Sequence, residues 1–405
     1  MIDNTSSKKN QIPGLRYCSR CCFPETVEGI EFDEMGICRS CVSSEQKIHI
    51  NWKDKEKTLR NILDNAKAKS GDNYDCVIPI SGGKDSTFQL YVLTRVYKMK
   101  PLAVTFNHNW MSKTGFYNLM NCLEQFNVDH IMYTPNRKLI SQSARKSIEE
   151  IGDSCWHCHA GIGAFPLHIA QKFKIPLLIW GESIADSSGK ASYEDPKIKF
   201  DRNYFTKVSA KVTPKKMTCN SPLKMKDLNM FEPPTTEELK EVGVWGIHLG
   251  DYIFWDDERQ TEFVKKHFGW REVEMEGTYK RYKGVECIMQ GVHDFMCYLK
   301  RGYGRTTWQA SLDVRNGLMT REEAFELINK YDKEVPEALK YFLEISNLGE
   351  TEFYDLIDKM KVEGVKDVKL PTTNRKSILE ESKRKPFVQQ LIDELRPQTD
   401  ENTNN

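Results

Sequence analysis

Short apolar runs alternate with amphipathic stretches from Tyr74 onward, and this alternation restricts the chain to few folds. The apolar runs are typical of strands and cover residues 76–80, 102–107, 130–134 and 177–181. The stretches between them predict helices over residues 86–97, 115–126, 139–151 and 161–173. Strands that alternate with helices pair in parallel through right-handed crossovers. The pattern predicts an α/β fold with a doubly wound parallel sheet, in which Pro79 must lie where the first strand leaves the sheet.

A glycine-rich loop joins the first of these strands to the helix that follows it, with the sequence Ser81-Gly82-Gly83-Lys84-Asp85-Ser86. Glycines allow a tight turn in which successive backbone N–H groups face an anion. The helix N-terminus adds a partial positive charge of about half a unit, and Lys84 adds a full charge. Asp85 would repel a phosphate, which indicates a bridging Mg²⁺.

The loop differs from the phosphate loop of NTPases that cleave at the γ-phosphate. It resembles the PP-loop of the N-type ATP pyrophosphatases, which implies an adenine nucleotide alpha hydrolase-like fold and ATP as the nucleotide. The candidate nucleotide ligands are Ser81, Gly82, Gly83, Lys84, Asp85 and Ser86. We expect Lys84 and Asp85 also to act in catalysis.

Two more candidates follow from the rule that ligands of an open α/β sheet bind at the carboxyl ends of its strands, near the point where the strand order reverses. The backbone near Phe106, at the end of the second strand, is a candidate for contact with adenine. Glu182, after the fourth strand, is a candidate for contact with a metal or substrate. Either residue could equally be an ordinary strand-end residue.

Two Cys-x-x-Cys pairs near the N-terminus, separated by sixteen residues, have the spacing of a zinc ribbon. The candidate ligands are Cys18, Cys21, Cys38 and Cys41. A site closed by four thiolates is structural, so Zn²⁺ here would stabilise a small module without taking part in chemistry. We expect the adjacent Cys22 not to be a ligand.

A third Cys-x-x-Cys pair, Cys155 and Cys158, lies in the middle of the chain and is followed by His159. The string matches a haem-attachment sequence, which does not suit an enzyme of this fold. It could be a redox pair, two ligands of an iron–sulfur or zinc site with Cys219 as a third, or helix-end packing with substrate contact. These possibilities stay open at the level of sequence, and a role in the active site is one of them.

Composition excludes some classes of function. The 405 residues carry a formal net charge of +1, so the whole molecule has no field that favours nucleic acid. No apolar run approaches the roughly 18 residues of a membrane span, and the polar N-terminus does not resemble a signal peptide. We therefore expect a cytoplasmic protein with reduced cysteines, no membrane contact and no nucleic-acid partner.

The expected organisation has five parts. Residues 1–15 form a disordered lead-in and 16–50 the zinc ribbon. Residues 51–310 form the PP-loop domain, which begins with a helix over 53–69 and is interrupted by a polar insertion or lid at about 186–240. Residues 311–395 are helical, with a capping box that begins at Thr320, and 396–405 form a disordered tail.

Beyond the PP-loop, the chain resembles the N-acetyl sugar amidotransferases of bacterial surface-polysaccharide biosynthesis. The segments that carry this resemblance are residues 18–21, 29–38, 81–86, 103–107, 152–161, 180–182, 250–256, 304–307 and 311–315. The resemblance implies an ATP-dependent amidotransferase that adenylates the N-acetyl oxygen of a nucleotide-activated sugar and replaces it with ammonia. AMP and pyrophosphate would be released, and the acetamidino sugar would enter lipopolysaccharide O-antigen or a related glycan. Residues 183–189 differ from the family pattern, in which an acidic-aromatic-glycine run is expected at this place. The difference affects the contacts that the resemblance implies with the sugar.

The ammonia is expected to come from a separate subunit. Position 2 is Ile2 rather than a cysteine nucleophile, and no Gly-x-Cys-x-Gly string occurs. The family's pairing with glutaminase and cyclase-like subunits implies the same arrangement.

Two other functions remain compatible with these motifs. A PP-loop tRNA thiolase would share the zinc ribbon, the nucleotide loop and a central Cys-x-x-Cys that binds an iron–sulfur cluster. A zinc-ribbon binding module with an inactive loop is the other, and the complete loop with Lys84, Asp85 and both serines disfavours it.

Overall fold

Five parallel strands form the central sheet of the computed structural model, which describes residues 11–183, 193, 205, 210–374 and 385–395. Their order across the sheet is β3-β2-β1-β4-β5. The strands are β1 (Cys76–Pro79), β2 (Pro101–Phe106), β3 (Asp129–Tyr133), β4 (Leu177–Trp180) and β5 (Trp245–His248). Because β1 pairs with β2 on one side and β4 on the other, the strand order reverses between β1 and β4. The sheet is therefore of the doubly wound parallel type that the sequence predicts.

Alternate residues of the strands face two separate hydrophobic cores. In β1, Val77 faces one core, whereas Cys76 and Ile78 face the other, and all three are fully buried. The first core is covered by helices α6 (Arg137–Ile151), α7 (Trp156–Phe173), α12 (Gln290–Arg301), α15 (Ala338–Ser346) and α16 (Glu350–Lys359). The second is covered by α3 (Trp52–Ser70), α4 (Lys84–Tyr91) and α5 (Lys113–Phe126).

The four predicted strands and the helices between them are present, with shifted ends. Pro79 is the last residue of β1, where its missing N–H costs no central ladder bond. The helix after the loop begins at Lys84 and continues as a π-helical turn, η1 (Val92–Val96). The sequence analysis missed β5, which pairs with β4 through Leu177 and Trp245 and the residues that follow them.

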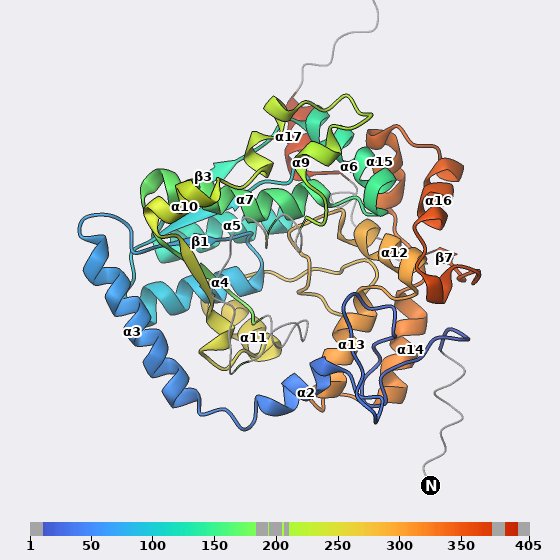
Figure 1. Cartoon of the computed structure of the whole chain (residues 1–405), viewed down its shortest axis with the longest axis horizontal. Helices are drawn as coiled ribbons and strands as arrows, with labels where there is room; N and C mark the ends of the chain where they lie inside the picture. Colours follow the sequence, from blue (N-terminus) through green and yellow to red (C-terminus); the bar gives the residue numbers. More distant parts are fainter. Residues whose placement is uncertain (1–10, 184–192, 194–204, 206–209, 375–384, 396–405) are drawn as a thin grey trace, which may run out of the picture.

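The remaining elements lie mostly in the second half of the chain. They are α2 (Arg39–Gln46), α9 (Pro214–Met217), η3 (Met225–Asp227), η4 (Asn229–Phe231), α10 (Thr236–Val242), η5 (Leu249–Asp251), α11 (Asp257–Phe268), α13 (Arg305–Arg315), α14 (Arg321–Tyr331), η6 (Glu363–Val365), α17 (Phe387–Leu395) and the short parallel pair β6 (Glu334–Val335) and β7 (Thr373–Asn374). The capping box expected at Thr320 is present at the start of α14. Figure 1 shows the dark-blue N-terminal segment beside α13 and α14, away from the sheet.

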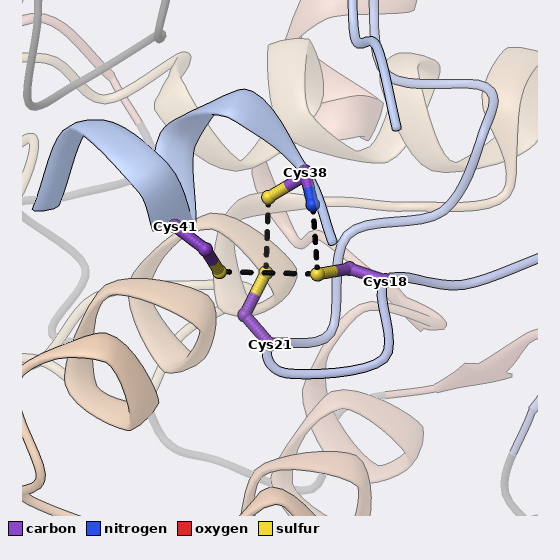
Figure 2. Close-up of side chains that lie close together, drawn as sticks. All are labelled: Cys18, Cys21, Cys38 and Cys41. Carbon is purple, nitrogen blue, oxygen red and sulfur yellow. Dashed lines mark hydrogen bonds between the residues drawn. The ribbon is translucent and has the colours of Figure 1, made fainter. Parts of the chain in front are cut away.

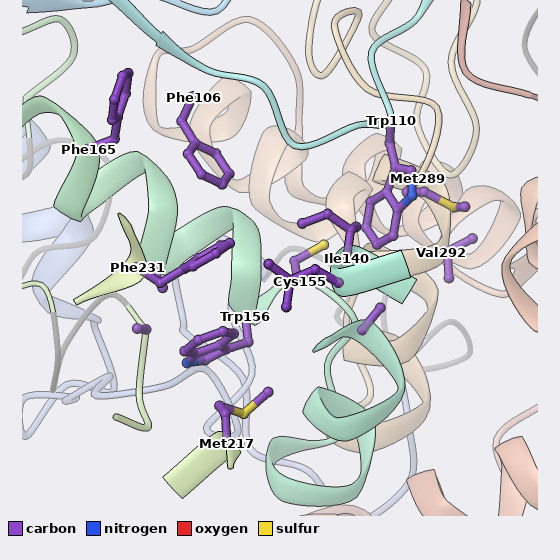
Figure 3. Packing of buried hydrophobic residues seen from close by; sticks show 14 of the residues in the cluster. Phe106, Trp110, Ile140, Cys155, Trp156, Phe165, Met217, Phe231, Met289 and Val292 are labelled. Atoms are coloured by element: carbon purple, nitrogen blue, oxygen red, sulfur yellow. The ribbon is translucent and has the colours of Figure 1, made fainter. Parts of the chain in front are cut away.

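The segment expected as an insertion or lid is partly integrated into the first core. Within residues 210–240, Met217, Leu228 and Phe231 are almost fully buried. The Phe231 ring stacks on Trp156 at a centroid separation of 5.6 Å, as Figure 3 illustrates. This half of the segment belongs to the body of the protein, because its apolar side chains cover α7. Residues 184–192, 194–204 and 206–209 lie outside the described residues.

Residues 11–15, expected within a disordered lead-in, are placed against the body of the protein. Leu15 is buried, and the Ile12 backbone N–H donates to the Tyr17 hydroxyl at 3.1 Å. Residues 1–10 and the expected tail at 396–405 lie outside the described residues. None of the helices described combines the length and apolarity that a bilayer span requires.

Gly82 shows why the loop after β1 needs glycine. Its φ angle is +84°, a conformation that disfavours a side chain. A Cβ at this position would also lie 2.6 Å from the Gly115 carbonyl oxygen and 2.7 Å from the Leu119 nitrogen. The loop is thus packed directly against the backbone of α5.

We expect Gly82→Ala to lower the free energy of unfolding by roughly 2–4 kcal/mol, because left-handed strain and a backbone clash add. Gly243→Ala is the matched control, since Gly243 has a φ of +72° but nothing within 4 Å of the added Cβ. The control should lose only about 1 kcal/mol. Urea unfolding followed by circular dichroism measures both, and equal losses would contradict the packing argument.

Candidate functional site

The phosphate loop is held by hydrogen bonds within itself and to one distant tryptophan. Ser81 Oγ accepts from the Gly83 backbone N–H at 3.2 Å, and Ser86 Oγ donates to the Gly83 carbonyl at 2.9 Å. The Trp270 indole N–H donates to the Gly82 carbonyl at 2.9 Å. These bonds fix the turn, and α4 begins directly after Gly83. The loop therefore has the preformed shape that binding of an anion at a helix N-terminus requires.

Lys84 is 1% exposed and takes part in a chain of alternating charges. Its ammonium lies 2.8 Å from Asp257 Oδ1 and also contacts Asp85. Lys283 reaches the other oxygen of Asp257 at 2.5 Å. Burial alone would raise the pKa of Asp257, but Lys283 and Lys84 together hold it well below its usual range. Asp257 is therefore a carboxylate that positions two cations beside the loop.

Lys283 keeps its charge at this place. Burial would lower its pKa, but the charges of Asp257, Asp85 and Glu182 outweigh burial and raise it. Two fixed cations beside the loop can each contact a phosphate oxygen, and Asp257 offsets part of their charge.

The predicted candidates Asp85 and Glu182 lie in this charge network. Asp85 accepts from the Trp255 indole N–H at 3.2 Å. The Glu182 side chain keeps contact with solvent, yet the protein atoms around it remove enough water to raise its pKa. Lys283 lowers that pKa, whereas the charge of Asp85 raises it further. The loop after β1 and the residues after β4 are thus brought together where the strand order reverses.

The Phe106 side chain is buried and is therefore not an exposed contact for a nucleotide. The side chain is 5% exposed, and its ring packs against Phe231 at a centroid separation of 5.4 Å. A Cβ at Gly161 would lie 2.2 Å from this ring, so α7 crosses directly over it. Only the backbone of Phe106 is therefore available for the expected contact with adenine.

Several residues of the site were missed because they follow the unpredicted β5 or lie still further along the chain. The residues after β5 bring Trp255 and Asp257 to the carboxyl edge of the sheet. Glu286 also borders the loop, since a Cβ at Gly83 would lie 3.5 Å from its Oε2. A strand predicted at residues 245–248 would have placed Asp257 near the carboxyl edge of the sheet. No spacing rule in the sequence points to Lys283 or Glu286.

A second cluster of reactive side chains surrounds Cys155, at the start of α7. Burial raises the pKa of the Cys158 and Cys287 thiols, and both thiols lie near Cys155. Cys219, expected as the third cysteine of a possible cluster, is instead exposed and donates to the Lys215 carbonyl. The third cysteine near Cys155 and Cys158 is Cys287.

Four N-terminal thiols form the other cluster, as Figure 2 shows. The sulfur atoms of Cys18 and Cys41 are 3.8 Å apart, and those of Cys21 and Cys38 are 3.6 Å apart. Tetrahedral coordination with metal–sulfur bonds of about 2.3 Å gives sulfur–sulfur separations of about 3.8 Å. The four thiols are buried, so thiolates this close together need a cation. Their geometry fits a closed structural metal site.

The cysteine module is fastened to α13 and α14. The Arg321 guanidinium donates to the carbonyl oxygens of Cys18 and Cys21, each at 3.0 Å. The Phe23 ring meets Trp308 edge-on at 4.8 Å. Cys22 is not among the four converging thiols and packs with Phe325 instead. Cys22 is thus a packing residue of this contact.

Comparisons with known proteins concern separate parts of the chain. Residues 276–370 match the family model described as the C-terminal domain of LPS biosynthesis proteins like WbpG. The uncharacterised protein MJ1599 of Methanocaldococcus jannaschii is 33% identical over 113 residues, which are 28% of this chain and 40% of that protein. The match thus spans less than half of that relative's length.

Two solved structures are similar at low identity. One is the NMN synthetase of Francisella tularensis, with 12% identity, a TM-score of 0.24 and coverage of 56% of this chain and 98% of the other. The other is a predicted subunit of tRNA methyltransferase from Methanocaldococcus jannaschii, with 16% identity, a TM-score of 0.22 and coverage of 48% and 87%. The assignment of the fold depends on the strand order and pairing described above.

We expect the purified chain to hold about one Zn²⁺ in the four-cysteine site, and Cys38→Ser to release it and to lower thermal stability. Removing one of the four ligands weakens the binding of the metal. Once the metal leaves, no cation neutralises the charges of the other buried thiolates. Cys219→Ser is the control, because Cys219 is exposed and stands apart from the site. Elemental analysis and thermal melts check both, and metal retained at this site in Cys38→Ser would refute the assignment.

Proposed function

We propose that the chain is an ATP-dependent amidotransferase that acts on a nucleotide-activated N-acetyl sugar in the biosynthesis of lipopolysaccharide O-antigen or a related surface glycan. The observation that carries this proposal is the preformed phosphate loop with Lys84, Asp257 and Lys283 at the reversal point of the sheet. The match of residues 276–370 to a domain of LPS biosynthesis proteins supports a sugar pathway.

The reaction would begin with attack of the amide oxygen of the N-acetyl group on the α-phosphorus of ATP. Pyrophosphate leaves, and the acetamido group becomes an imidate bonded to AMP. Ammonia then adds to the imidate carbon, AMP departs with the oxygen, and loss of a proton leaves an acetamidino group. An amide oxygen is a poor leaving group, and adenylation converts it into a phosphate ester that leaves readily.

The residues of the site have distinct parts in this scheme. The loop amides and Lys84 bind the β- and γ-phosphates, so that the pyrophosphate can leave as a unit. Asp257 holds Lys84 and Lys283 in place. Asp85 and Glu182 are the carboxylates available to the Mg²⁺ that accompanies ATP. A raised pKa also makes Glu182 a candidate for proton transfer from the attacking ammonia.

The nitrogen source in this proposal is a separate glutaminase subunit, paired with a cyclase-like subunit that delivers ammonia. The proposal places the complex in the cytoplasm, where ATP and nucleotide-activated sugars are present. Free ammonium should replace the partner subunits in the test tube.

One observation favours the alternative of a tRNA thiolase, namely the grouping of Cys155, Cys158 and Cys287 near the site. Such an enzyme would bind tRNA and carry an iron–sulfur cluster. The net charge of +1 and the match to an LPS biosynthesis domain favour the sugar substrate instead. Iron and sulfide in an anaerobically purified sample would reverse this preference.

We expect ATP to be converted to AMP and pyrophosphate when the chain is incubated with ammonium and nucleotide-activated N-acetyl sugars. Lys84→Ala should lower kcat by about 10²–10³, since it removes a charge that stabilises the departing pyrophosphate. Nucleotide products are separated by chromatography, and the sugar product is identified by mass spectrometry.

Lys69→Ala is the matched control, because Lys69 is exposed near the end of α3 and should leave the rate unchanged. Circular dichroism spectra of both variants establish that the fold is kept. Formation of ADP and inorganic phosphate, or full activity in Lys84→Ala, would contradict the proposal.

A further inference from the structure

Asp153, Cys155 and His293 form a second group of possible metal ligands. Each offers one ligand atom, and the three atoms lie within 4.8 Å of one another. Asp153 is 7% exposed and Cys155 is 9% exposed, whereas His293 keeps partial contact with solvent. His293 Nδ1 lies 2.9 Å from Asp153 Oδ1. The three donors thus converge, and one of them, His293, keeps contact with solvent.

The fold holds the first two donors rigidly. Asp153 and Cys155 lie in the short connection between α6 and α7, where the Cys155 backbone N–H donates to Asp153 Oδ1 at 2.8 Å. Ser147 donates to the Asp153 carbonyl, which closes the connection onto α6. Gly152 ends α6 with a φ of +60° and turns the chain toward the site.

The third donor is tied to the same connection through its own helix. His293 and Lys300 both belong to α12. The Lys300 ammonium donates to the carbonyl oxygens of Ile151 at 2.8 Å and Gly152 at 3.2 Å. A buried lysine therefore fastens α12 to the residues just before Asp153. The three ligand atoms are thus preorganised by the contacts that join α6, α12 and the connection to α7.

We propose that Asp153, Cys155 and His293 bind a divalent metal ion of the zinc class, with one coordination position left open. Carboxylate oxygen, thiolate sulfur and imidazole nitrogen are the ligand types of zinc, and three protein ligands with an open fourth position are typical of catalytic zinc sites. Binding exchanges the hydrogen bond between His293 and Asp153 for bonds from both side chains to the ion.

The site lies close to the proposed reaction centre. Cys287, whose thiol lies near Cys155, directly follows Glu286, and Glu286 borders the phosphate loop at Gly83. An ion with an open position at this place could bind and polarise an oxygen of the acceptor substrate. The proposal itself rests on the ligand geometry and is independent of the reaction assigned above.

A competing arrangement would use sulfur alone. Cys155, Cys158 and Cys287 could hold an iron–sulfur cluster, and such a cluster would need neither Asp153 nor His293. In the part of the chain that the structure describes, these three sulfur atoms do not together form a group that converges within 4.8 Å. Ligand substitution therefore separates the two arrangements.

The test is the metal content of the full chain, purified without chelators from cells grown with added zinc. We expect about two zinc ions per chain in the unmodified protein. His293→Ala and Asp153→Asn should each lose about one ion and keep the other, whereas Cys38→Ser should lose the ion that these variants keep. The ion retained in the four-cysteine site, together with an unchanged circular dichroism spectrum, shows that each variant is folded.

Cys158→Ala and His159→Ala are the matched controls, because both residues are neighbours of the proposed ligands without belonging to the set. Both should keep about two ions. Loading with Co²⁺ provides a second readout, since a sulfur–cobalt charge-transfer band from this site should persist in Cys38→Ser and vanish when Cys155→Ser is added. A single zinc ion in the unmodified chain overturns the proposal. So does an iron- and sulfide-containing sample whose metal is lost in Cys158→Ala but kept in Asp153→Asn.

Discussion

The ion chain from Asp85 through Lys84 and Asp257 to Lys283 is the interaction on which the candidate active site depends. Lys84 is almost fully buried, and an unpaired ammonium in that position would be strongly unfavourable. Asp257 makes its burial possible and at the same time shares its second oxygen with Lys283. The charges that suit a polyphosphate are thus part of the packing of the sheet edge, and the site is preorganised before any nucleotide binds.

Local sequence patterns predicted the centre of the fold well. The apolar runs at β1 to β4 have the length and flanking turns that strands require. The loop from Ser81 to Ser86 combines glycines, serines and a lysine in a pattern that is typical of phosphate loops. The four-cysteine spacing predicted a cluster that the structure brings together. In each case the signal lies within a short stretch of chain, where backbone geometry and residue type determine the outcome.

Other parts could not be predicted because their contacts are remote in sequence. Strand β5 has only four residues, of which Trp245 and His248 are half-buried, so its apolar pattern is weak. Without a predicted β5, no sequence pattern places Asp257 beside the loop. The sequence analysis named Cys219 as a possible third cysteine and not Cys287, because position along the chain does not show which distant segment lies beside α7. The described half of the 186–240 segment is polar on average, yet Met217, Leu228 and Phe231 within it are buried.

The attachment of the cysteine module to α13 and α14 means that the order of segments along the chain is not their order in space. The N-terminal ribbon shares Arg321, Trp308 and Phe325 with helices that follow it by almost three hundred residues. Shortening the polypeptide to begin at the sheet would strip an apolar face from those helices and leave the Arg321 guanidinium without its carbonyl partners. Engineered fragments of this protein should therefore keep the N-terminal ribbon together with α13 and α14.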